Sequence, residues 1–190
     1  PMLKNQAHLC MNRVWGAVFF LAASVGVLAQ AGGSPMAFGD GSYGQLGNGH
    51  FGYNDLPAQV DGITGVTAIG AGYDYSLALK NDGTVWGWGS NRYGQLGQGS
   101  ATPPEAQFPL QVQGLAGVMA IAAGGWHALA LKSDGTLWAW GYNFAGELGN
   151  GTSGTGTDSA VPVQVTGLAG VTVIAAGKTH SLALKSDGTL

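Results

Sequence analysis

The sequence has very little cysteine and few charged residues. Cys10 is the single cysteine in 190 residues, so no disulfide within the chain contributes to its stability. Charged residues make up only 9% of the chain, and Lys and Arg together number 7. A nucleic-acid-binding domain needs clustered basic residues, and anionic lipid selects polybasic segments; neither pattern is present. The composition therefore argues against nucleic acid and against a lipid surface as partners.

Long segments suited to α-helices are also missing after residue 31, where glycine is abundant. The chain contains 35 glycines and is 45% hydrophobic. Disordered chains combine low hydrophobicity with high charge, so this composition excludes a disordered protein. Abundant glycine together with strong hydrophobicity is typical of many short strands joined by tight turns. The length is sufficient for one domain with a hydrophobic core.

Residues 1–31 have the features of a secretory signal peptide. Arg13 precedes an uncharged apolar run from Val14 to Ala29, and Ala29-Gln30-Ala31 matches a small-x-small cleavage site. We expect the natural start at Met11 and cleavage after Ala31, which predicts a secreted or cell-envelope protein. An uncleaved N-terminal anchor is the alternative, although the apolar run is shorter than the about 20 residues that span a membrane.

Removal of residues 1–31 makes the remaining chain more acidic. Residues 32–190 contain five Lys and Arg residues and ten Asp and Glu residues, for a net charge of about −5. This balance strengthens the exclusion of nucleic acid as a partner.

The most informative feature is an internal repeat. Three copies of one phrase begin at Val66, Val118 and Val171, and the first reads "VTAIGAGYDYSLALKNDGTVWGWGSNRYGQLGQG". The repeat length is about 52 residues, which lies in the range of propellers and solenoids. An earlier half-copy, "MAFGDGSYGQLGNG", begins at Met36. We therefore divide residues 32–190 into repeats at 36–65 (half), 66–117, 118–170 and 171–190 (truncated).

Each complete copy divides into four pieces with strand patterns. In the first copy the first three pieces are Val66–Gly70, Tyr75–Lys80 and Thr84–Trp88. Asp-Gly between the second and third pieces is a strong hairpin signal. The fourth piece has a proline near its start, which suits a sheet edge; the three examples are Pro57–Val60, Pro109–Val112 and Pro162–Val165. Four antiparallel strands in about 50 residues, repeated, describe a blade of a β-propeller.

Alternation along the strands predicts that both faces of each blade are buried. Leu77 and Leu79 share a face of the second strand, with Ala78 on the other, and Trp86 and Trp88 share a face of the third. We expect one bulky face and one small face on each blade, so that the bulky face of one blade fills the small face of the next.

The phrases "WGWGSNRYGQLGQG" and "WAWGYNFAGELGNG", the latter preceded by "HALALKSDGT", closely resemble the regulator of chromosome condensation repeat. The resemblance covers about residues 36–190 and implies an all-β fold, part of a seven-bladed propeller. The chain would supply about two full blades and two half-blades. The repeat residues with an expected structural role are Trp86, Trp88, Trp138, Trp140, Gly94, Leu96, Gly97, Gly146, Leu148 and Gly149.

The expected first and last elements are complementary halves of a blade, which in such propellers close the ring together. We expect the chain to be a fragment of a longer protein whose further repeats complete the ring. Self-association of short chains is the alternative, in which two copies would give about six blades.

Residues with chemical potential mostly have structural explanations. His127 and His180 begin the second strand of their copies, but Tyr75 takes that place in the first copy, so we expect them to bond a neighbouring blade. Asp82, Asp134 and Asp187 lie in x-Asp-Gly turns and suit turn formation. We therefore expect no catalytic residues, no metal and no cofactor.

The turns between the first and second strands differ most among the copies. They contain Tyr73-Asp74, then Gly125-Trp126, then Lys178-Thr179. Loops on a rigid scaffold carry recognition, and exposed aromatic residues dominate interface hot spots. Tyr73, Asp74, Trp126, Lys178 and Thr179 are therefore candidates for a partner-binding rim; solvated turns free to vary are the alternative.

Three functions remain open. The first is a non-catalytic, exported scaffold that binds a protein of unknown identity through its rim loops. The second, implied by the family resemblance, is guanine-nucleotide exchange on a small GTPase. The third is a carbohydrate-active propeller enzyme whose acidic residues lie in further repeats.

Overall fold

In a computed structural model of the chain, residues 32–188 are described, and they form twelve β-strands and no helix. The predicted signal peptide lies outside the described residues. The strands are β1 (Met36–Gly39), β2 (Asn54–Gln59), β3 (Val66–Ala71), β4 (Tyr75–Lys80), β5 (Val85–Ser90), β6 (Glu105–Gln111), β7 (Val118–Ala123), β8 (His127–Lys132), β9 (Leu137–Gly141), β10 (Ser159–Gln164), β11 (Val171–Ala176) and β12 (Ser181–Lys185).

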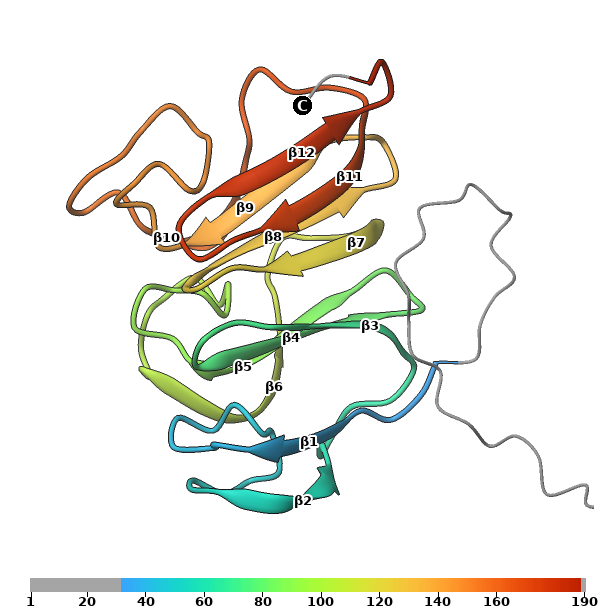
Figure 1. The fold of residues 1–190 in the computed structure, drawn as a ribbon, viewed down its shortest axis with the longest axis vertical. Helices are drawn as coiled ribbons and strands as arrows, with labels where there is room; N and C mark the ends of the chain where they lie inside the picture. The colour runs from blue at the N-terminus through green and yellow to red at the C-terminus, as the bar shows by residue number, and fades with distance from the viewer. Residues whose placement is uncertain (1–31, 189–190) are drawn as a thin grey trace, which may run out of the picture.

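The strands form four antiparallel sheets that follow one another along the molecule (Figure 1). The orders are β1-β2, β3-β4-β5-β6, β7-β8-β9-β10 and β11-β12. Each sheet lies within one of the repeats assigned from the sequence. The predicted fold class is confirmed: the described residues make two complete four-stranded propeller blades and two two-stranded sheets.

The fourth strands begin earlier than predicted. Pro57, Pro109 and Pro162 lie inside β2, β6 and β10, not near their starts. Irregular register in all three pairings with the neighbouring third strand accommodates the extra residues. Each proline still lies on an edge strand, as expected from its missing N–H.

The hairpin between the second and third strands has a three-residue loop. In the first blade Lys80 N donates to Thr84 O across Asn81–Gly83, and Gly83 has a φ of 77°. Asp82 Oδ1 accepts hydrogen bonds from Thr84 N (3.0 Å) and Thr84 Oγ1 (2.6 Å). The Thr84 hydroxyl and amide, with weaker help from Lys80, lower the pKa of Asp82 to about 2. Asp134 makes the same two bonds with Thr136.

This loop sets a strand register that differs from the predicted faces. Ala78 pairs with Trp86 and Leu77 pairs with Gly87, so tryptophan and alanine share one face while leucine and glycine share the other. A two-residue turn would have brought leucine and tryptophan together, as the prediction of one bulky face assumed. A change of one residue in register exchanges the faces of a whole strand. The prediction of a bulky and a small face was therefore wrong.

Blades interlock through these mixed faces. The leucine face of the first blade, with Leu77 and Leu79, packs against Ala128, Ala130 and Trp140 of the second. The contact repeats between the second blade and β11-β12, and between β1-β2 and the first blade. Burying each large apolar side chain stabilises the fold by about 1.5–3 kcal/mol, so a blade depends on its neighbours.

The fully buried indole of Trp140 also makes a polar contact between blades. Its Nε1 donates to Gln95 O of the preceding blade at 2.8 Å, and Trp88 Nε1 donates to Gln45 O at the same distance. Gly97 lies beside this indole, and a Cβ there would be 3.2 Å from Trp140 Nε1. The G-Q-L-G segment of one repeat therefore contacts the second tryptophan of the W-x-W segment in the following repeat.

Candidate functional site

The turns predicted to form a rim are hydrogen-bonded from blade to blade. Tyr73 N donates to Gly125 O, and Gly125 N donates to Lys178 O, both at 3.2 Å. A Cβ on Gly125 would lie 2.6 Å from Lys178 O, so this close approach requires glycine. The three variable turns thus lie side by side at one end of the blades.

A continuous cluster of aromatic rings covers this end. We call it the aromatic strip, and it consists of Tyr73, Tyr93, Trp126, Tyr142 and Phe144. Trp126 lies at its centre, with ring centroids 5.1 Å from Tyr73 and 5.9 Å from both Tyr93 and Tyr142. Tyr93 and Tyr142 are 4.7 Å apart, and Tyr142 stacks with Phe144 at 6.3 Å. These separations are typical of favourable aromatic contacts.

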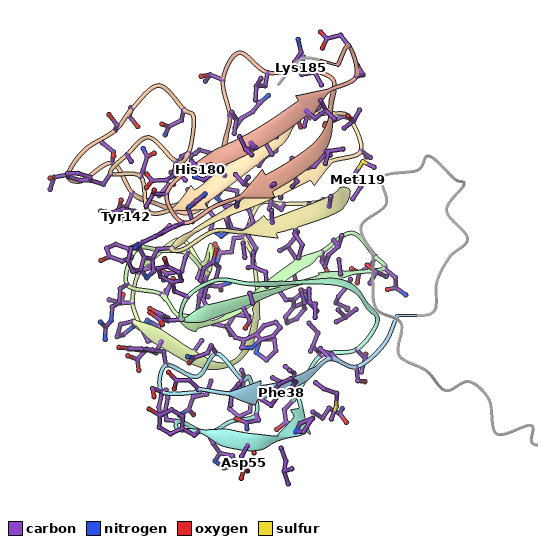
Figure 2. All side chains as sticks on the ribbon, in the orientation of Figure 1. Phe38, Asp55, Met119, Tyr142, His180 and Lys185 are labelled. Atoms are coloured by element: carbon purple, nitrogen blue, oxygen red, sulfur yellow. The ribbon has the colours of Figure 1, made fainter. Side chains whose placement is uncertain are left out.

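The strip is accessible to solvent. Tyr73 is 49% exposed and Phe144 is 56% exposed, and the other three rings are half-buried. Figure 2 shows Tyr142 on the left side of the molecule and Met119 on the right side. Exposed apolar rings gathered at one end of a rigid scaffold mark an interaction surface.

Two cations accompany the rings. Lys178 Nζ lies 5.5 Å from the centroid of the Tyr73 ring, and the Arg92 guanidinium lies 4.9 Å from that of Tyr43. Arg92 also pairs with Glu105 at 3.7 Å. Both cations therefore already use aromatic faces as partners.

The predicted rim residues divide into two groups. Tyr73 contacts both Trp126 and Lys178. Asp74 follows Tyr73, and its backbone O accepts from Ser90 N, whereas Thr179 is exposed and lines a groove beside β12. The structure therefore joins three of the five candidates directly.

Sequence reasoning missed Tyr93, Tyr142 and Phe144. They lie in the segments "GSNRYGQLG" and "GYNFAGELG", for which the repeat predicts a structural role only. Within these phrases Ser90 corresponds to Tyr142, Arg92 to Phe144 and Tyr93 to Ala145. The signal that could have identified them is this variation between copies at positions flanking an unchanged asparagine.

That asparagine anchors the loop behind the strip. Asn143 is fully buried; its Nδ2 donates to Thr152 and Thr157, and its Oδ1 accepts from Leu148 N. Asp158 Oδ1 accepts from Asn143 N at 2.8 Å. Asn91 makes similar contacts with Ser100 and Pro103. The strip thus rests on loops held by buried side-chain hydrogen bonds.

A buried carboxylate lies beneath the strip. Glu147 takes the place of Gln95 and is 3% exposed; its Oε2 accepts from Ala145 N, while its Oε1 has no hydrogen-bond partner among the described residues. Partial desolvation raises the pKa of Tyr142, and the negative charges of Glu147 and Asp158 add to the effect together with Tyr93. The field of both acids therefore reaches the strip.

The buried histidine and its serine have a structural geometry. His127 Nε2 lies 3.1 Å from Ser181 Oγ, which donates to Glu147 O at 2.8 Å. Tyr75 at the equivalent position donates its hydroxyl to His127 O. These contacts join neighbouring blades, in agreement with the structural role expected for His127. No group of three or more His, Cys, Asp or Glu within residues 32–188 could hold a metal ion.

The grooves of the molecule belong to blade packing. One of about 400 Å³ is lined by residues that include Glu147, Leu148, Val165, Ser181 and Ala183. These are the counterparts of residues that surround Trp140 in the preceding blade contact.

No helix in the described part of the chain has the length and apolar character of a membrane span.

Comparison with known proteins agrees with this architecture. The model of the regulator of chromosome condensation (RCC1) repeat matches residues 37–79, 82–131 and 134–184. A second model of the same repeat matches residues 66–95 and 119–147. The family resemblance noted from the W-x-W and G-Q-L-G segments is thereby confirmed.

Relatives share the fold but are much longer. Human E3 ubiquitin-protein ligase HERC2 is 39% identical over 155 residues, which are 77% of this chain and 3% of HERC2. The crystal structure of human WBSCR16 matches with a TM-score of 0.70 and 28% identity over 82% of this chain and 41% of that one. Yeast RCC1 (Prp20), solved bound to Kap60, matches with a TM-score of 0.71 and 26% identity over 82% of this chain and 38% of that one. This chain belongs to the RCC1 repeat family and contributes blades of its β-propeller.

Proposed function

We propose that this chain is a non-catalytic binding module that holds a protein partner through the aromatic strip. The observation that carries the proposal is the contiguity of five aromatic rings, contributed by turns and loops of neighbouring blades, at one end of the scaffold. Tyrosine and tryptophan supply large contact area with little loss of conformational freedom on binding.

Two further observations support a binding role. His127 and Ser181 join neighbouring blades, and Asp82 and Asp134 fix turns, so these residues have structural roles, whereas the rings of the strip face solvent. Yeast RCC1, a structural relative, was solved in complex with the protein Kap60. A protein that contains this repeat thus forms a complex with another protein.

Affinity capture with the full chain tests the proposal. Trp126→Ala removes the central ring, and Met119→Ala, an exposed apolar residue on the opposite side, is the matched control. We expect Trp126→Ala to lose the partner that wild type and Met119→Ala retain, while both variants keep the circular-dichroism spectrum of the folded wild type. Equal capture by all three proteins would refute the strip as the binding surface.

We also propose that the module acts outside the cytoplasm. The proposal rests on the apolar run from Val14 to Ala29 and the Ala29-Gln30-Ala31 site. N-terminal sequencing of protein recovered from the envelope or medium should begin at Gly32. Replacement of Leu21 by Arg in the apolar run should retain the protein in the cytoplasm; full export of that variant would contradict the proposal.

A further inference from the structure

We propose that the aromatic strip binds a basic segment of its partner, with Lys or Arg side chains on the exposed rings and their charges facing the surrounding acids. This inference rests on the proposed binding function and specifies its chemistry.

Each part of the strip has an acidic neighbour. Asp74 follows Tyr73 in the first turn, and Glu105 begins β6 beside the loop that carries Tyr93. Glu147 and Asp158 act on the Tyr142 hydroxyl through their charge. Acids therefore accompany the rings along the whole strip, from the first blade to the second.

The rings themselves already accept cations. Lys178 lies over Tyr73, and Arg92 lies over Tyr43 at the edge of the strip. The negative faces of aromatic rings attract ammonium and guanidinium groups most strongly when both are partly desolvated. The same chemistry is available on Trp126 and Phe144, over which no Lys or Arg within residues 32–188 lies.

The charge balance at this end favours a cationic occupant. Acids near the strip include Asp40, Asp74, Glu147 and Asp158, whereas Arg92 already pairs with Glu105 and Lys178 lies over Tyr73. An acidic partner would meet repulsion along the strip, and an uncharged one would gain nothing from the carboxylates. Complementary charge also accelerates encounter and fixes register.

The test uses the full chain and three fluorescent peptides of equal length. One carries alternating Lys and Arg between Gly and Ser, the second carries Asp and Glu at the same positions, and the third is uncharged. Fluorescence anisotropy should show the basic peptide binding at least about tenfold more tightly than either of the others. Its affinity should fall with added NaCl, because screening weakens exposed charge pairs.

Variants separate ring chemistry from charge. Trp126→Leu keeps apolar area but removes the π-system, and should weaken the basic peptide about 3- to 30-fold, whereas Trp126→Phe should restore part of the loss. Asp74→Asn should weaken it about two- to fivefold. Asp61→Asn, a matched loss of one exposed carboxylate after β2 at the opposite end, should leave it unchanged.

The outcomes discriminate between the two proposals. Preference for the acidic or the uncharged peptide, or an affinity for the basic peptide that Trp126→Leu and Asp74→Asn leave unchanged, overturns the inference of a basic partner. Failure of all three peptides overturns it as well. The binding function itself then stands or falls on the capture experiment with Trp126→Ala, which does not depend on the peptide's charge.

Discussion

His127 gives the structure a specific dependence on pH. Its ring is 1% exposed, its Nε2 contacts Ser181 Oγ, and its Nδ1 has no hydrogen-bond partner among the described residues. Burial, with a smaller contribution from the charge of His180, lowers the pKa of His127 from 6.5 to about 4 against a weak opposing backbone bond. Protonation would place an unpaired charge between two blades.

The sign and size of the effect follow from the two protonation equilibria. The folded state binds the proton more weakly than the unfolded state, so the stabilisation is complete above pH 6.5 and is lost as the pH falls from 6.5 to about 4. A lowering of this size corresponds to about 3 kcal/mol of unfolding free energy across that window.

His127→Tyr provides the matched variant. Tyr75 takes this place in the preceding blade and donates its hydroxyl to His127 O, so a tyrosine at 127 has an equivalent acceptor in His180 O. Urea unfolding at pH values from neutral to acidic should show the wild type losing about 3 kcal/mol more than the variant. Parallel pH profiles for the two proteins would refute the reasoning.

Two further predictions concern stability and are measured by urea unfolding at neutral pH. Gly94 and Gly146 both have positive φ, but a Cβ on Gly94 would lie 2.5 Å from Ala160 Cα, whereas one on Gly146 would meet nothing closer than 3.7 Å. Gly146→Ala should therefore lower the free energy of unfolding by about 1–2 kcal/mol, and Gly94→Ala by about 3 kcal/mol or more. Equal losses would contradict the close approach at Gly94. Trp140→Phe leaves Gln95 O without its donor in the core and should cost at least about 2 kcal/mol, whereas Trp138→Phe, at a half-buried ring whose Nε1 bonds Thr136, should cost less than about 1 kcal/mol. A reversed order would contradict the interlocking of blades through Trp140.

The repeat made most of the fold predictable, because each copy supports the interpretation of the others. β4 has the predicted bounds, since the Asn81–Gly83 turn follows Tyr75–Lys80 directly. The faces of the blades were not predictable from alternation alone. Alternation assigns residues to faces within one strand, whereas the relation between two strands depends on the length of the loop that joins them. Here Lys80 pairs with Thr84 across three residues, and a two-residue turn would pair Lys80 with Gly83 instead.

The site was predictable only in part. Variation between copies identified Tyr73 and also Trp126 and Lys178, both of which contact Tyr73. Tyr93, Tyr142 and Phe144 join them from a different loop, and that proximity depends on the stacking of blades. Because no local pattern encodes which loop of one blade meets which turn of the next, the continuous strip emerges only in three dimensions.

Site-specific photo-crosslinking tests the binding surface most directly. Phe144 in the strip and Met119 on the opposite side of the molecule are 56% and 59% exposed, so a photoreactive phenylalanine analogue at either position is equally accessible. Crosslinks to the partner from position 144 and none from position 119 are the predicted result. Crosslinks from position 119 alone, or equal yields from both, would contradict recognition through the aromatic strip.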